Sequence, residues 1–430
     1  MMTDKKELEL YVHIPFCVRK CAYCDFLSGP AGEAEKAAYV DALLTEIRSR
    51  KENYKDYRVS TVFLGGGTPS ILEGEDAARI FHTIRESFEV SPDAEITMEV
   101  NPGTVTREKA EAWKRAGVTR LSIGLQSVND RELKMLGRIH TYSEFVRTWE
   151  LVRRTGFDNV NIDLISAIPG QTQESWEKTL RTVAELGPEH LSAYSLIVEE
   201  GTLFYERYGG ENGPADAGNP ALISLPALPD EDTEREIYRM TERILREYGY
   251  HRYEISNYAR KGYECRHNLG YWERVEYLGL GLGASSLVSA LTGEFRFHNT
   301  SDMEKYRKFF GRKYENAEKD MQTETGGETG GSPESPQEDI RKKAGPAAEE
   351  VEELDANDRM EEFMFLGLRK MAGISCEAFR KNFGKPIEEV YGPQIARFTE
   401  LGLMEREGDR LRLTEKGIDV SDSVFVEFML

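Results

Sequence analysis

The chain has 430 residues and a formal net charge of -20. This length allows two or three domains with at least one large core, and the excess of acidic side chains argues against binding to nucleic acid. The five cysteines do not make a disulfide framework, and no segment approaches the roughly 20 consecutive apolar residues of a membrane span. We therefore expect a cytoplasmic protein without a transmembrane segment.

Between residues 8 and 202 the sequence alternates a short apolar strand, a polar turn and an amphipathic helix. Six strands are expected, at residues 8–14, 60–66, 95–101, 120–126, 159–165 and 190–198. This alternation is typical of βα units that are joined by crossover helices. It predicts an α/β fold, a partial (β/α)6 barrel that resembles part of a TIM barrel and has a wider mouth than a closed barrel.

Three of the five cysteines directly follow the first expected strand. Cys17, Cys21 and Cys24 have the spacing C-x3-C-x2-C, at the edge of the barrel where sites form. Three thiolates can hold a [4Fe-4S] cluster and leave one iron open for an outside ligand. The alternative is a zinc ion, whose fourth ligand would be His13 or a residue elsewhere in the chain.

The expected strands also carry polar or glycine residues where a ligand at the barrel rim would meet them. These residues are Tyr11 on the first strand, Gly65, Gly66, Gly67 and Thr68 after the second, and Glu99, Gln126 and Asp163 on the next three. Each residue alone is also explained as a solvated strand end, and glycine serves any tight turn. Because five successive strands bring such groups, a shared binding rim is the favoured interpretation.

Residues 1–230 are assigned to the barrel, and residues 231–310 to a region that completes and extends it. Within the first part, residues 208–229 are rich in glycine and proline and predict a loop or a lid. Residues 311–354 contain TETGGETGGSPESPQED and hold much of the acidic excess. Without periodic apolar residues they predict a disordered acidic insertion.

Residues 355–430 predict a winged-helix-like α+β module of three helices and a β-hairpin that turns at Gly408 and Asp409. The expected recognition helix carries Glu388, Glu389 and Glu400 against one arginine. A helix that reads DNA is basic, so a docking or lid role is favoured over DNA binding.

The three-cysteine motif within YVHIPFCVRKCAYCDF, together with GGGTPS after the second strand, resembles the radical S-adenosylmethionine superfamily. LSIGLQS, LGRIH and the C-terminal module resemble its oxygen-independent coproporphyrinogen III oxidase-like family. The resemblance implies that Cys17, Cys21 and Cys24 bind three irons of a [4Fe-4S] cluster, that S-adenosylmethionine chelates the fourth, and that a flavodoxin or ferredoxin supplies electrons. It also implies cofactor contacts from Tyr11, Tyr23, Gly66, Gly67, Thr68, Glu99, Gln126, Arg138 and Asp163.

Within this family the resemblance leaves two functions open. A dehydrogenase would decarboxylate the propionates of coproporphyrinogen III by radical chemistry, whereas the heme chaperone (HemW-type) branch binds heme and transfers it to acceptor proteins. The dehydrogenases carry a fourth cysteine where this chain has Phe26, and an N-terminal extension where ten residues precede Tyr11 here. Both departures favour the chaperone branch.

The stretch CRHNLGYW, residues 265–272, resembles the H-N-x-x-Y-W motif of that branch. The resemblance implies that His267 is an axial heme ligand through its imidazole, with Tyr271 and Trp272 beside the porphyrin. The alternative is that His267 only forms hydrogen bonds while the aromatic rings pack in the core. A third possibility, an interaction protein whose barrel has lost its chemistry, is disfavoured by the intact cysteine triplet.

Overall fold

The computed structural model describes residues 5–209, 225–311 and 335–430. Its central feature is a parallel sheet in which six strands are neighbours in chain order, as the sequence predicts. The strands are β1 (Lys6–Ile14), β2 (Tyr57–Gly66), β3 (Val90–Val100), β4 (Arg120–Gln126), β5 (Val160–Ser166) and β6 (His190–Ser195). The sixth strand ends before the predicted residue 198, because the chain leaves the sheet at the rim of the cavity described below.

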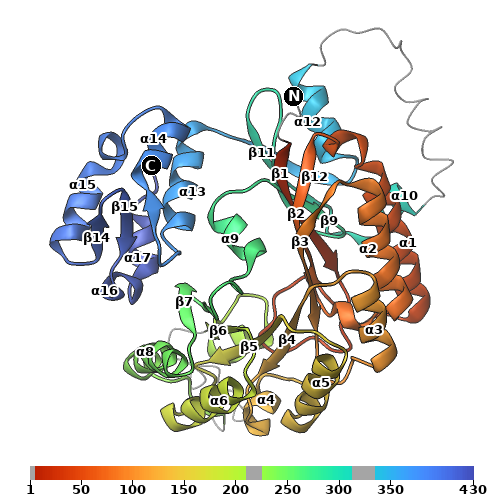
Figure 1. Cartoon of the computed structure of the whole chain (residues 1–430), viewed down its shortest axis with the longest axis horizontal. Helices are drawn as coiled ribbons and strands as arrows, with labels where there is room; N and C mark the ends of the chain where they lie inside the picture. The colour runs from red at the N-terminus through yellow and green to blue at the C-terminus, as the bar shows by residue number, and fades with distance from the viewer. Residues whose placement is uncertain (1–4, 210–224, 312–334) are drawn as a thin grey trace.

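The crossover helices lie on the outer side of this sheet (Figure 1). They are α1 (Glu33–Ser49), α2 (Gly74–Ser87), α3 (Arg107–Arg115), α4 (Asp130–Met135), α5 (Tyr142–Arg154) and α6 (Gln173–Leu186), with short 3-10 turns at Glu52–Tyr54 and Pro69–Ile71. Helix α1 buries the apolar stripe that contains Tyr39, Leu43 and Ile47. Thr141 and Glu144 form a capping box that fixes the start of α5.

Alternation along the strands separates an apolar face from a polar one. On β1, Leu8, Leu10 and Val12 belong to the core beneath the helices, whereas Glu9 and Tyr11 point to the opposite side. The polar side of the sheet therefore lines the interior of the partial barrel.

Short strands extend this sheet at both edges, which the sequence pattern did not predict in detail. One edge adds β9 (Tyr277–Leu280), parallel to β1, and then the antiparallel β10 (Ser285–Ser289), β11 (Glu294–Asn299) and β12 (Ala348–Leu354). The other edge adds the antiparallel β8 (Asn257–Ala259) and β7 (His251–Glu254). In the described parts of the chain the sheet has the order β12-β11-β10-β9-β1-β2-β3-β4-β5-β6-β8-β7. The remaining helices of this part are α7 (Leu203–Tyr208), α8 (Glu231–Glu247), α9 (Arg266–Trp272), α10 (Met303–Phe310) and α12 (Pro336–Ala344).

The prediction of disorder for the whole of residues 311–354 was wrong at its C-terminal end. Helix α12 and strand β12 occupy most of residues 336–354. The buried guanidinium of Arg50 donates to the carbonyl oxygen of Ala344 at 2.7 Å and holds the end of α12. Strand β12 is stabilised by pairing with β11, a distant segment. Residues 312–334, and residues 210–224 of the predicted loop or lid, lie outside the described residues.

Residues 356–426 form the C-terminal module, coloured blue in Figure 1. Its helices are α13 (Ala356–Gly367), α14 (Cys376–Phe383), α15 (Ile387–Glu400), α16 (Glu415–Ile418) and α17 (Ser421–Val426), and its sheet contains β13 (Ile374–Ser375), β14 (Met404–Glu407) and β15 (Arg410–Leu413). The hairpin of β14 and β15 turns at Gly408 and Asp409, as predicted. The module has its own apolar core around Met364, Phe379 and Tyr391.

Helix α9 lies between the module and the open side of the sheet (Figure 1). It contacts β2 on one side and α13 on the other. None of the helices in the described ranges is long and apolar enough to cross a membrane.

Candidate functional site

A cavity of about 490 Å³ opens at the carboxyl ends of the parallel strands. Cys17, Cys21 and Cys24 all line it, and each is partly exposed. Eight other residues that the sequence singled out also line it, namely Tyr23, Gly66, Gly67, Thr68, Glu99, Gln126, Arg138 and Asp163. The structure therefore brings together 11 of the 13 predicted site residues, because parallel strands deliver their carboxyl ends to one rim.

The loop that carries the cysteines is fixed to the neighbouring strands by hydrogen bonds. The backbone N–H of Cys17 donates to the carbonyl oxygen of Gly29 at 2.9 Å. The Cys17 sulfur lies 3.3 Å from the hydroxyl of Thr68, and the Arg138 guanidinium lies 3.7 Å from the Cys21 sulfur. Burial, with a smaller contribution from the neighbouring Cys21 and Cys17, raises the pKa of the Cys24 thiol to about 11.

The glycine run is required where β2 approaches the cysteine loop. The N–H groups of Gly67 and Thr68 donate to the carbonyl oxygens of Ile14 and Phe16, at 2.8 Å and 2.7 Å. A Cβ at Gly67 would lie 2.6 Å from the Phe16 carbonyl oxygen. Gly66 has a φ of +104°, and a Cβ there would lie 2.5 Å from the His13 ring. Larger side chains at both positions are thus excluded by close packing as well as by the left-handed conformation of Gly66.

Two buried carboxyl groups face the cavity. Glu99 accepts the backbone N–H of Gly66 at 3.2 Å, and burial, then the nearby Asp163, raise the pKa of Glu99 to about 8. Asp163 accepts from the Ser122 hydroxyl at 3.0 Å and from the Asn161 amide at 2.7 Å, and burial raises its pKa as well. Both groups are held in fixed orientations where a cationic or hydroxyl-bearing ligand could meet them.

Arg138 and Gln126 complete the wall that faces these carboxyl groups. Arg138 donates to the side-chain oxygen of Asn101 at 2.7 Å and to the carbonyl oxygen of Gly124 at 2.6 Å. These bonds hold the guanidinium beside Cys21. Gln126 has a φ of 76°, which is unusual for a residue with a side chain. Such strain often occurs at binding sites.

Tyr11 is one of the two predicted residues that do not line the cavity. His13 Nε2 lies 2.8 Å from the carbonyl oxygen of Leu27, and His13 Nδ1 lies 3.0 Å from the Tyr11 hydroxyl. Because a carbonyl oxygen only accepts, Nε2 carries the proton and Nδ1 accepts from Tyr11. Tyr11 therefore supports His13, which contacts both the cysteine loop and Gly66.

His267 is the other predicted residue outside the cavity lining. It lies on α9 inside the barrel and is 1% exposed. Its Nδ1 is 2.7 Å from the Thr61 hydroxyl and its Nε2 is 3.1 Å from the Tyr271 hydroxyl. Burial and the nearby Arg120 lower the pKa of His267 to about 3, so the ring is neutral at pH 7.

Sequence reasoning missed several residues of this site. Asn101 and Gly124 contact Arg138, and Ser122 holds Asp163. Their positions at strand ends, beside residues that were singled out, could have indicated them. The exposed apolar Phe26 and Ile197 at the cavity mouth, 62% and 66% exposed, gave no such indication because they follow no periodic pattern.

The alternative of a zinc site requires several protein ligands around one ion. His13, the fourth ligand that the zinc alternative invoked, uses both ring nitrogens within the protein. The three thiols instead share the wall of a cavity that is large enough for a ligand beside them.

Comparison with known proteins places the chain in a class and then in a family. Residues 11–183 match the model of the Radical SAM superfamily, and residues 354–420 match the HemN C-terminal domain. The solved structure of coproporphyrinogen III oxidase (HemN) from Escherichia coli has a TM-score of 0.75 at 22% identity, and covers 99% of this chain and 90% of that chain. The fold and the three-cysteine cavity therefore define a radical SAM protein with a HemN-like architecture.

Proteins that are similar in sequence identify the family within this class. The heme chaperone HemW of Lactococcus lactis is 31% identical, over 99% of this chain and 98% of its own length. That of Bacillus subtilis is 31% identical over 97% and 98%, and that of Escherichia coli is 39% identical over 75% and 80%. The chain belongs to the heme chaperone HemW family.

Proposed function

We propose that this protein is a cytoplasmic heme chaperone that holds a [4Fe-4S] cluster and S-adenosylmethionine in the rim cavity and transfers heme to acceptor proteins. The observation that carries the proposal is the similarity, over nearly the full length, to proteins named as heme chaperones. The cavity supports the cofactor assignment, because three partly exposed thiols, a glycine run and two carboxyl groups converge there.

In this proposal, Cys17, Cys21 and Cys24 would hold the cluster. The cluster with its bound S-adenosylmethionine would supply one-electron chemistry at an open iron. Gly66 and Gly67 let the end of β2 pack closely against His13 and the start of the cysteine loop, which positions the thiols. Glu99 and Asp163 can accept from ammonium or hydroxyl groups. An electron donor of the flavodoxin or ferredoxin kind would approach the cysteine loop at the cavity mouth.

The heme ligand is assigned to His267. In the closed arrangement both nitrogens of its ring have hydrogen-bond partners, but one partner, Tyr271, lies on α9 itself. Separation of α9 from Thr61 on β2 would free the ring together with the aromatic residues of the motif. Since the imidazole is neutral at pH 7, a ring nitrogen could bind iron without first losing a proton.

We expect His267→Ala to abolish stoichiometric heme uptake by the anaerobically reconstituted protein, measured from the Soret absorption during a heme titration. His251→Ala is the matched control, because His251 is an exposed histidine on β7. Equal heme spectra for the His267→Ala variant and the unaltered protein would contradict the ligand assignment. A variant in which all three cysteines are changed to serine tests the cluster site separately. We expect this variant to lose its bound iron and sulfide.

The dehydrogenase function remains the second candidate, because the fold of coproporphyrinogen III oxidase covers nearly the whole chain. The same reconstituted protein should therefore be incubated with coproporphyrinogen III, S-adenosylmethionine and a reductant. The chaperone proposal predicts no release of carbon dioxide. Turnover to a decarboxylated porphyrinogen would overturn it in favour of the dehydrogenase.

A further inference from the structure

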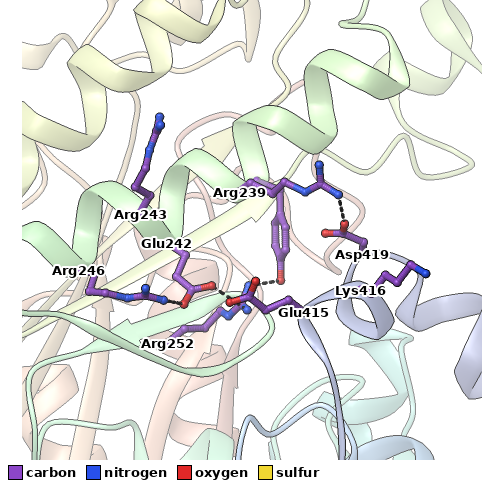
Figure 2. A pocket seen from close by; sticks show the side chains of 9 residues that line it. Arg239, Glu242, Arg243, Arg246, Arg252, Glu415, Lys416 and Asp419 are labelled. Atoms are coloured by element: carbon purple, nitrogen blue, oxygen red, sulfur yellow. Dashed lines mark hydrogen bonds and ion pairs between the residues drawn. The ribbon is translucent and has the colours of Figure 1, made fainter. Parts of the chain in front are cut away.

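A second cavity, of about 500 Å³, lies where the barrel meets the C-terminal module. Helix α8 forms one wall, Arg252 of β7 contributes a second, and residues 415–419 of the module close it (Figure 2). Arg239, Arg243 and Arg246 line it at i, i+4 and i+7 and so share one side of α8. This cavity is formed by residues other than those of the rim site.

The lining of this junction cavity is basic although the chain is acidic overall. Its five cationic and three acidic side chains leave a net charge of +2, in a chain whose net charge is -20. The acidic groups are Glu242, Glu415 and Asp419. Together they reduce the positive charge of the lining without cancelling it. A cavity with this excess attracts anions.

Not all of these cations are used within the protein. Arg239 pairs with Asp419, whereas Arg246 and Arg252 share Glu242 (Figure 2). Among the described residues, the side chains of Arg243 and Lys416 form no ion pair and no hydrogen bond. They are exposed, and they come from α8 and from α16.

Arg252 adds a buried positive charge to the lining. Its side chain is 6% exposed, donates to the Tyr238 hydroxyl at 3.1 Å and pairs with Glu242 at 2.8 Å. Because Glu242 is shared with Arg246, this single carboxylate does not neutralise both guanidinium groups. Arg252 therefore attracts an anion through its charge, while Arg243 and Lys416 supply the free donors.

We propose that the junction cavity binds a phosphate-bearing ligand with at least two negative charges. A terminal phosphate has three acceptor oxygens and can therefore bind several guanidinium and ammonium groups at once, whereas a carboxylate suits a single arginine. The cavity volume lies within the range of small-molecule sites. Because Arg243 comes from α8 and Lys416 from α16, a ligand that bound both side chains would connect the barrel with the module.

The probe for this site is inorganic pyrophosphate, titrated calorimetrically into the full chain at constant ionic strength. We expect saturable binding at one site, weakened at least tenfold in the variant Arg243→Ser/Lys416→Ser, since each lost charged hydrogen bond costs about 1.5–3 kcal/mol. Arg235→Ser/Lys381→Ser is the matched control, because it removes the same charges from exposed positions of α8 and α14 outside the cavity. This control should bind as the unaltered protein does.

Hydrogen exchange gives a measurement that needs no variant. Pyrophosphate should slow exchange in α8 and in residues 415–419 of the unaltered protein, and leave α14 unchanged. Absence of saturation at millimolar pyrophosphate, or equal weakening in both double variants, would overturn the proposal, since either result means unspecific attraction.

Vesicles distinguish two sources of the phosphate. The protein could sediment with phosphatidylglycerol vesicles and not with phosphatidylcholine vesicles, and pyrophosphate could reverse this sedimentation. That result would assign the site to an anionic lipid headgroup. Binding of pyrophosphate without sedimentation would assign it to a soluble phosphate ester. Sedimentation that persists in Arg243→Ser/Lys416→Ser while pyrophosphate fails to bind would overturn the junction cavity as the site.

Discussion

Glu9 lies in the barrel interior beside His267, with its Oε2 3.8 Å from His267 Nδ1. Burial raises the pKa of Glu9 from 4.5 to about 9, and burial lowers that of His267, so both groups are neutral at pH 7 and do not form an ion pair. The Glu9 Oε2 atom has no hydrogen-bond partner among the described residues. The burial of Glu9 at this position therefore lowers the stability of the folded protein.

This environment predicts how Glu9→Gln changes stability with pH. The folded protein keeps the Glu9 proton between about pH 4.5 and 9 while the unfolded chain loses it, so the folded state loses stability as pH rises through this window. Glutamine does not titrate. The free energy of unfolding of Glu9→Gln relative to the unaltered protein should therefore rise by up to about 1.4 kcal/mol per pH unit, as measured by denaturant unfolding at pH 5 to 8.

Glu52→Gln is the control for this prediction, since the Glu52 side chain is exposed and is not among the groups that shift the pKa of Glu9. Its difference from the unaltered protein should stay constant with pH. A constant difference for Glu9→Gln as well would contradict the buried, protonated state of Glu9.

At the scale of elements, helix α9 is held from two sides. Glu95 accepts the N–H groups of Arg266 and His267, each at 3.3 Å, from the barrel side. From the module, the Arg369 guanidinium lies 4.4 Å from the centre of the Trp272 ring, and Lys370 pairs with Glu273 at 2.8 Å. The module therefore stabilises the arrangement in which His267 is buried.

If heme binds to His267, release of α9 limits its uptake. Arg369→Ala/Lys370→Ala removes a cation–π contact and an ion pair that together contribute about 1–2 kcal/mol. We expect heme to associate about 5- to 30-fold faster in stopped-flow measurements, with faster hydrogen exchange in residues 266–272. Arg380→Ala/Lys381→Ala, on α14, should have no effect. Faster exchange without faster association would contradict α9 as the limiting element.

The elements that were predicted correctly have local causes. The strands β1 to β6 are apolar runs, and their carboxyl ends follow from the parallel order, so most of the predicted site residues do line the cavity. Strand β12 could not be predicted, because four of the seven residues in AEEVEEL are glutamates and the strand forms through pairs such as Arg296 with Glu352. The burial of His267 depends on Thr61 and Glu95, which are far away in the sequence.

For the molecule as a whole, Glu362 is the main charged link between barrel and module. Its side chain is 6% exposed and pairs with Arg274 at 2.9 Å and with Arg296 at 2.5 Å. Removal of Glu362 leaves Arg274 paired with Glu294 at 2.7 Å and Arg296 partly exposed. The loss is therefore that of charged hydrogen bonds, about 1.5–3 kcal/mol. Since the module has its own core, this loss falls mainly on its attachment.

We therefore expect Glu362→Ala to divide thermal unfolding into two transitions, with the module melting first, in differential scanning calorimetry. Glu388→Ala removes an exposed ion pair with Arg406 inside the module and should leave a single transition with nearly the same midpoint. A single transition that moves as one unit in Glu362→Ala would show that the apolar contacts alone couple the two parts.

The two ends of the segment 312–334 are anchored around one buried carboxylate. Tyr306 of α10 donates to Glu46 at 2.6 Å, and Arg50, which pairs with Glu46 at 3.0 Å, holds the end of α12. Because these contacts fix the described chain on both sides of residues 312–334, an affinity tag or a fluorescent reporter inserted between these positions should leave the barrel core and heme uptake intact.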